Sequence, residues 1–130
     1  MTRQPSIIEM ALYLQSPLVM IQMSLRLTPP PERLDEVIDA FRLLAARTEV
    51  RPGCRQSWVE EDPHKHGAVF YHEKWSSWAE MEKRVRSNTF LQILQLIEIS
   101  VCAPVLNFEG PNKRCGMEFV HALRKNSATP

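Results

Sequence analysis

Residues 68–86 change from strand-like to helix-like periodicity within a few positions, and this change constrains the fold more than any other feature. Residues 68–75 follow Gly67 and are dense in aromatic and β-branched side chains, which predicts a β-strand. Ser77 and Glu80 have the spacing of a capping box, which predicts that a helix begins there. A junction between a strand and a helix holds its side chains rigidly and leaves one side of the junction uncovered, so we expect a pocket here.

Alternation and helical spacing define the elements around this segment. Residues 18–27 alternate apolar and mixed positions, which predicts a strand with one dry face. Pro31 favours the first turn of a helix, and Pro52-Gly53 is typical of a helix end. Pro104 indicates an edge strand or a bulge. In chain order we predict a strand over 18–27, a helix between Pro31 and Pro52, strands over 54–61 and 68–75, a helix over 77–97 that is split at Ser87-Asn88, and a strand over 100–108.

The order β-α-β-β-α-β is the ferredoxin-like arrangement of an α+β fold, an antiparallel sheet with its helices on one face. Both helical connections cross the same face, which leaves the other face uncovered. Met20, Trp58, Phe70 and His72 or their neighbours are expected to be exposed there. Because patches of that size usually mark association, we predict a homodimer formed through the open sheet face.

The two ends of the chain lie outside this pattern. Residues 1–17 form an N-terminal appendage whose apolar side chains recur near helical spacing and need a surface to pack on. Residues 18–109 form the ferredoxin-like domain, and residues 110–130 form a C-terminal extension. Within that extension, residues 117–123 fit a strand or a helix equally well.

Composition excludes several classes of protein. The chain has 130 residues, the length of one domain, and a formal charge of +1, which argues against a dedicated nucleic-acid binder. Three cysteines, an odd number without paired metal spacing, favour a reducing compartment. No apolar run approaches the roughly 18 residues that a membrane span needs. We therefore expect a cytoplasmic protein with no membrane partner.

Nucleotide and metal cofactors are not expected either. The glycines are too far apart to form a phosphate-binding turn, which argues against flavin and nicotinamide cofactors. His64 and His66 stand beside Asp62 in a manner that suggests a metal site, but polar turns of this kind are usually solvated.

The chain resembles the antibiotic biosynthesis monooxygenase family of dimeric α+β barrel proteins over about residues 18–109. The resemblance depends on four segments and their spacing: Arg51-Pro-Gly-Cys54, Asp62-Pro63, Phe70-Tyr-His-Glu-Lys-Trp75 and Ser87-Asn-Thr-Phe90. It implies a homodimer with two facing sheets and a small cavity between the sheet and the helices of each subunit. It also implies oxidation of hydroxylated polycyclic aromatics or quinols without flavin, haem or metal, although other members degrade haem or isomerise small phosphorylated signals.

Cofactor-free oxygenation needs a base, an apolar slot and hydrogen bonds to a developing oxyanion. His72 suits the base because its ordinary pKa is near neutral, and the position of Trp75 matches a Glu-x-Trp of the family. Strand alternation puts His72 on the face opposite Trp75, so only one of the two sets lines the cavity unless the strand bulges. The predicted catalytic residues are His72, Glu73 and Trp75, and the predicted substrate-binding residues are Trp58, Tyr71, Arg84 and Phe90.

Other interpretations compete with this one. Trp75 also suits a core anchor, and His72 also suits a partly buried histidine with a satisfied hydrogen bond. Haem degradation is disfavoured because the first strand has no Asn, and the expected Trp and His positions hold Arg84 and Leu94. The remaining rivals are a non-catalytic small-molecule-binding dimer, and an isomerase in which Arg84 or Arg26 would bind a phosphate.

Overall fold

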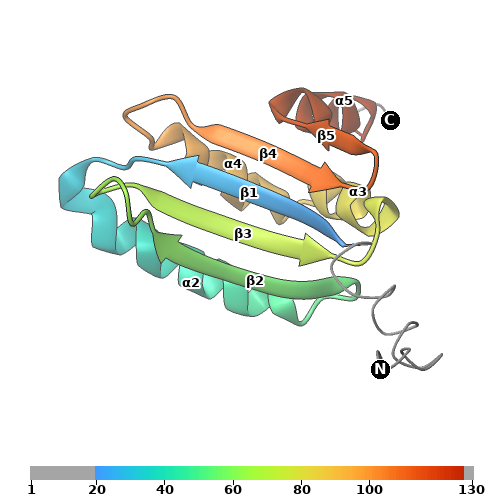
Figure 1. Cartoon of the computed structure of the whole chain (residues 1–130), viewed down its shortest axis with the longest axis horizontal. Coiled ribbons are helices and arrows are strands. Elements are labelled where there is room, and N and C mark those ends of the chain that lie inside the picture. Colours follow the sequence, from blue (N-terminus) through green and yellow to red (C-terminus); the bar gives the residue numbers. More distant parts are fainter. Residues whose placement is uncertain (1–19, 128–130) are drawn as a thin grey trace, which may run out of the picture.

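The computed structural model describes residues 20–127, and its helices cover one face of a single antiparallel sheet (Figure 1). The strands follow the spatial order β2-β3-β1-β4-β5. The strands are β1 (Ile21–Leu27), β2 (Cys54–Glu61), β3 (Val69–Trp75), β4 (Val105–Gly110) and β5 (Lys113–Cys115). The helices are the 3₁₀ turn η2 (Pro31–Arg33), α2 (Leu34–Glu49), α3 (Trp78–Arg86), α4 (Phe90–Glu98) and α5 (Met117–Ser127).

Alternation in the two central strands creates the core. In β1 every second side chain is buried against the helices, and β3 pairs with it so that Leu25 lies beside Tyr71 and Met23 beside Glu73. The ring of Phe41, on the apolar stripe of α2, stacks on Tyr71 with centroids 4.8 Å apart. The predicted dry face of the first strand is therefore confirmed for residues 21–27.

Turn chemistry fixes the helix ends that surround the site. After α2, Gly53 has a φ of +87°, and a Cβ added to it would lie 2.7 Å from the side chain of Glu80. Ser77 caps α3 by accepting a hydrogen bond of 3.2 Å from the Glu80 amide. These two contacts bring the start of α3 against the α2–β2 turn, at the end of β3.

The predicted element order is confirmed, but the last strand begins later than expected. Residues 101–104 are irregular, and β4 starts at Val105, directly after Pro104. Val101 donates a 2.7 Å hydrogen bond to the Thr28 carbonyl, which ties this segment to the end of β1 instead of extending the strand. β5 pairs with the other side of β4 only at residues 108–110, so within the described residues the half of β4 beside Pro104 pairs with β1 alone. The predicted edge is therefore present at this half, but Pro104 lies before the strand and not within it.

The C-terminal extension adds both a strand and a helix to the expected pattern. Residues 117–123 are helical and belong to α5, which packs on the helix side of the sheet through Phe119 against Phe108 and Trp78. Arg124 donates hydrogen bonds of 2.8 and 3.0 Å to the Val85 and Ser87 carbonyls at the end of α3. The predicted N-terminal appendage, residues 1–17, lies outside the described residues. Between residues 20 and 127 no helix has the length and apolar character that a membrane crossing requires.

Candidate functional site

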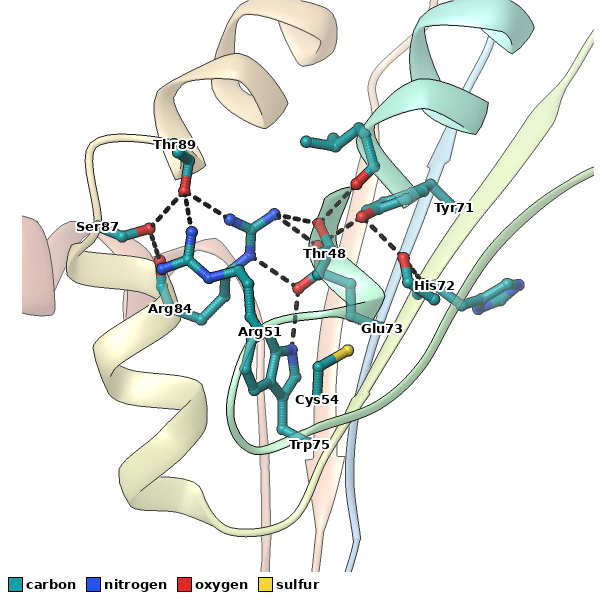
Figure 2. Close-up of polar contacts among 12 residues, drawn as sticks. Thr48, Arg51, Cys54, Tyr71, His72, Glu73, Trp75, Arg84, Ser87 and Thr89 are labelled. Carbon is teal, nitrogen blue, oxygen red and sulfur yellow. Dashed lines mark hydrogen bonds and ion pairs between the residues drawn. The ribbon is translucent and has the colours of Figure 1, made fainter. Parts of the chain in front are cut away.

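A buried carboxylate, that of Glu73 in β3, is the centre of the polar network on the helix side (Figure 2). Arg84 of α3 forms a two-point ion pair with it, from Nε at 3.0 Å and from Nη2 at 2.9 Å. The Trp75 indole N–H and the Tyr71 hydroxyl also donate to it, at 2.9 and 2.6 Å. Alternation in β3 explains this grouping, because residues 71, 73 and 75 share one face.

Burial and charge set the protonation of this network. Burial alone would lower the pKa of Arg84, but the hydrogen bond and charge of Glu73 raise it above its ordinary value. Burial raises the pKa of Tyr71 far above its ordinary value, and the neighbouring Glu73 charge adds to the effect. Arg84 is therefore a permanent cation, and Tyr71 remains a neutral hydroxyl that donates to Glu73.

Two threonines hold the rest of the Arg84 guanidinium. Thr48 of α2 accepts from Nη2 at 3.2 Å, and Thr89 accepts from Nη1 at 2.9 Å. Arg51 donates to the same Thr89 oxygen at 2.7 Å, so two guanidinium groups meet at one hydroxyl (Figure 2). The last turns of α2 and α3 and the α3–α4 turn are thereby joined around Arg84.

A pocket of about 200 Å³ opens beside this network. The carboxylate in its lining belongs to Glu80, and one of its oxygens lies 3.6 Å from the Lys83 ammonium. A smaller cavity of about 70 Å³ shares Arg51 and Arg84 with it. The pocket is lined by Arg51, Pro52, Trp75, Glu80, Lys83 and Arg84.

His72 lies on the opposite, open face of the sheet, as alternation requires. Its side chain is only 10% exposed, and the imidazole stacks with the rings of Trp58 and Phe70, whose centroids lie 4.6 and 5.6 Å away. Nδ1 lies 3.0 Å from the Ser24 hydroxyl and Nε2 lies 3.1 Å from a Glu60 carboxylate oxygen. Burial lowers the pKa of His72, although Glu60 opposes that effect.

The structure thus separates the predicted site residues into two groups. Tyr71, Glu73, Trp75 and Arg84 meet on the helix side, where the Phe90 ring centroid lies 5.8 Å from Arg84 Cζ. Trp58 and His72 lie together on the open face, apart from that cluster.

Sequence reasoning did not assign five polar residues of the helix-side site: Thr48, Arg51, Glu80, Lys83 and Thr89. Arg51 and Thr89 each stood in one of the segments that carry the family resemblance, and this was the available signal. Glu80 was expected to close a capping box, but its carboxylate lines the pocket beside Lys83.

The His64 and His66 turn shows no sign of metal binding. Both histidines are exposed, and the Asp62 carboxylate beside them accepts from Arg26 at 2.9 Å and from the His64 amide at 2.8 Å. Over residues 20–127, no group of three or more His, Cys, Asp or Glu side chains is arranged to hold a metal ion.

Comparisons with known proteins support the expected family. A family model described as antibiotic biosynthesis monooxygenase matches residues 20–96, and no curated protein is significantly similar to the chain in sequence. A conserved protein from Methanosarcina mazei Go1 is similar in structure, with 21% identity and a TM-score of 0.67 over 75% of this chain and 97% of its own.

Two further solved structures carry the family description in their names. An antibiotic biosynthesis monooxygenase candidate from Deinococcus radiodurans shows 17% identity and a TM-score of 0.62 over 72% of this chain and 93% of its own. A second candidate of this family, from Caulobacter crescentus CB15, shows 19% identity and a TM-score of 0.62 over 74% of this chain and 92% of its own. These neighbours establish a shared ferredoxin-like α+β fold, and the family model covers more than half of the sequence. The chain therefore belongs to the antibiotic biosynthesis monooxygenase family.

Proposed function

We propose that the protein is a cofactor-independent monooxygenase that oxidises a small aromatic, polyketide-like or quinol substrate in the pocket beside Trp75. The observation that carries this proposal is the lining of that pocket, where the cations of Arg51 and Lys83 accompany an indole wall and the guanidinium of the Arg84–Glu73 pair. A phenolic substrate bound there loses its proton more readily, because nearby positive charge favours the anion. The anion is the electron-rich form that reacts with oxygen.

Glu80 is the proton acceptor in this proposal, because its carboxylate lines the pocket while His72 lies on the other face. The substrate anion passes one electron to O₂, and the resulting radical and superoxide combine to form a C–O bond. The peroxide then takes a proton, and loss of the remaining C–H proton breaks the O–O bond. For a hydroxyanthrone, one oxygen atom stays in the product as a carbonyl, and the other leaves as water.

The Glu73–Arg84 pair has a positioning role in this reaction. Glu73 already accepts four hydrogen bonds, so it is a poor base, but it fixes the guanidinium and the indole that form the pocket wall. The Trp75 N–H is donated to Glu73, so the substrate meets the indole ring and not its donor.

Dimerisation through the open sheet face is the second part of the proposal. The half-buried rings of Trp58 and Phe70 lie on that face together with His72, and Val105 is 46% exposed on β4, on the far side of Arg26. A second copy would cover these apolar side chains. Sedimentation should give a dimer that Phe70→Glu converts to a folded monomer, while Leu91→Glu on the exposed side of α4 leaves it dimeric. A monomeric wild type would contradict this part.

Three free thiols, Cys54, Cys102 and Cys115, support a cytoplasmic location for this reaction, because thiols persist in a reducing compartment.

Oxygen consumption by the metal-stripped full chain tests the proposed reaction. Hydroxyanthrones and quinols are offered in turn, and hydroxyanthrone products formed under ¹⁸O₂ are examined by mass spectrometry. Consumption above the protein-free rate, with one labelled atom in the product carbonyl, is expected. If no compound raises consumption and none gains label, the oxygenase proposal fails.

A non-catalytic binding module is the second candidate, and one observation favours it. Every polar group that surrounds Glu73 is engaged within the protein, which is typical of a network that maintains a cavity. Such a module would retain a ligand through purification and would show no Glu80-dependent oxygen consumption.

A further inference from the structure

Helices α2 and α4 both lie on the helix side of the sheet (Figure 1). Side chains of these two helices line a groove of about 340 Å³. Its walls carry apolar side chains from both helices, and Leu43 is 54% exposed there. Its size is at the lower end of the range that small-molecule sites occupy, roughly 300–1,000 Å³. The groove is lined by Ala40, Leu43, Leu44, Arg47, Gln92, Gln95, Leu96 and Ile99.

Positive charge gathers at one end of this groove. Leu44, Arg47 and Gln92 also line the smaller cavity next to it, which is where Arg51 and Arg84 lie. Neither cavity has an Asp or Glu in its lining. Glu73 neutralises Arg84, which leaves two further cations at this end.

Those two cations, Arg47 and Arg51, are not compensated by the rest of the described chain. Among residues 20–127 neither has a carboxylate within ion-pair distance, and Arg51 is held by the Thr89 hydroxyl that Arg84 also uses. Arg47 and Arg51 both line the smaller cavity, so their positive charges repel each other, and an anion beside them would relieve that repulsion.

We propose that this groove binds an amphipathic anion of small-molecule size. Its apolar body lies between Leu43 and Leu96, and its single acidic head, a carboxylate, sulfonate or phosphate, pairs with Arg47 and Arg51. The apolar wall belongs to α2 and α4, whereas the proposed oxygenation pocket is built on Trp75, so this is a further site. The two sites share Arg51, and the groove is independent of any oxygenase reaction.

Fluorescence titration of the full chain with two matched probes tests this proposal. The probes are 1-anilinonaphthalene-8-sulfonate and N-phenyl-1-naphthylamine, which share an aromatic body but differ by the sulfonate. We expect the anionic probe to bind more tightly and to lose affinity as salt is added. Decanoate should displace it.

Three substitutions assign the binding to the groove. Arg47→Gln should weaken the anionic probe about threefold and leave the neutral probe unchanged, which is the range for an exposed charge pair. Leu43→Ser should weaken both probes. Arg42→Gln is the matched control, because Arg42 is on the same helix but 70% exposed and beside Asp39, and it should change neither.

Three results would overturn the proposal. The first is equal affinity for both probes with no effect of Arg47→Gln. The second is loss of the anionic probe on Lys74→Gln instead, which would put binding on the open sheet face. The third is that the full chain binds neither probe until Ile8→Glu and Leu12→Glu are introduced, which would assign the groove to the chain's own N-terminal segment. No result depends on oxygen consumption, so failure here is distinct from failure of the proposed function.

Discussion

The carboxylate of Glu73 and the guanidinium of Arg84 form a two-point ion pair with side-chain exposures of 0% and 1%. A buried pair of this kind is costly to break, because the charge that remains has lost both water and its partner. Here the pair also joins β3 to α3, and through Thr48 and Thr89 it reaches α2 and the α3–α4 turn. Its integrity therefore determines the shape of the pocket beside Trp75.

Removal of one partner should destabilise the protein more than removal of both. Glu73→Leu leaves Arg84 buried and unpaired, and we expect a loss of about 3–5 kcal/mol in the free energy of unfolding. The double variant Glu73→Leu/Arg84→Met removes both charges and should recover much of that loss. Urea denaturation of the two variants and of Arg84→Met measures the coupling. Additive losses would show that the two side chains stabilise the fold independently.

Arg124 should anchor the C-terminal extension to the body of the domain. Its guanidinium donates to the Val85 carbonyl in the last turn of α3 and to the Ser87 carbonyl, which also accepts from the Phe90 amide. We expect Arg124→Gln to cost about 1 kcal/mol of stability and to speed proteolysis within α5. Arg114→Gln, which breaks an exposed pair with Glu109, is the matched control and should change little. Equal effects of the two variants would count against a capping role.

The stability of the fold should decrease in mild acid because of His72. Burial lowers its pKa below the ordinary value of 6.5, and the Lys74 charge adds to this while Glu60 opposes it. Below about pH 6.5 the unfolded chain therefore binds more protons at this site than the folded chain does. The free energy of unfolding should fall as the pH decreases from 6.5 toward the lowered pKa.

Urea denaturation of wild type, His72→Gln and His66→Gln at a series of pH values around and below 6.5 tests this pH dependence. We expect His72→Gln to flatten the pH dependence, whereas His66→Gln in the exposed β2–β3 turn retains the wild-type slope. A wild-type slope in His72→Gln would assign the effect to other groups.

Cys54 should be the least reactive of the three cysteines in this chain. Burial is the main cause that raises its pKa to about 11, and the Glu73 charge adds to it. At pH 8 only about one Cys54 side chain in a thousand is then a thiolate, the reactive form. We expect Cys102, which is exposed, to react first with a disulfide reagent and Cys54 to react much later. Mass spectrometry of the labelled peptides gives the order, and early labelling of Cys54 would contradict its burial.

The fold was predictable because its local signals agree with one another. Pro31 begins the 3₁₀ turn that leads into α2, Gly53 follows the end of α2, Ser77 caps α3, and a period of two defines β1 and β3. The start of β4 was not predictable from the apolar pattern, because the tie between Val101 and Thr28 is a contact between distant segments. The helical state of residues 117–123 likewise depends on tertiary packing of Phe119.

The candidate site was predictable in its faces but not in its contacts. Alternation correctly indicated that His72 and Trp75 lie on opposite sides of the sheet. It did not show that Arg84 reaches Glu73, because that contact depends on how α3 docks on β3. The pocket position of Glu80 was missed because the capping box predicted that its carboxylate would bond the Ser77 amide, whereas only the Glu80 amide takes part in the cap and the side chain lines the pocket.

Oxygen consumption by variants on the two faces of the sheet tests most directly whether the helix-side pocket is the active site. The substrate is the hydroxyanthrone or quinol that wild type oxidises fastest, and each variant is first shown to be folded. We predict that Glu80→Gln loses most of the rate, since removal of a positioned base costs roughly 10²–10⁴-fold, while His72→Gln retains it at pH 8. The opposite result, a large loss in His72→Gln with Glu80→Gln unchanged, would place the chemistry on the open face and contradict the helix-side site.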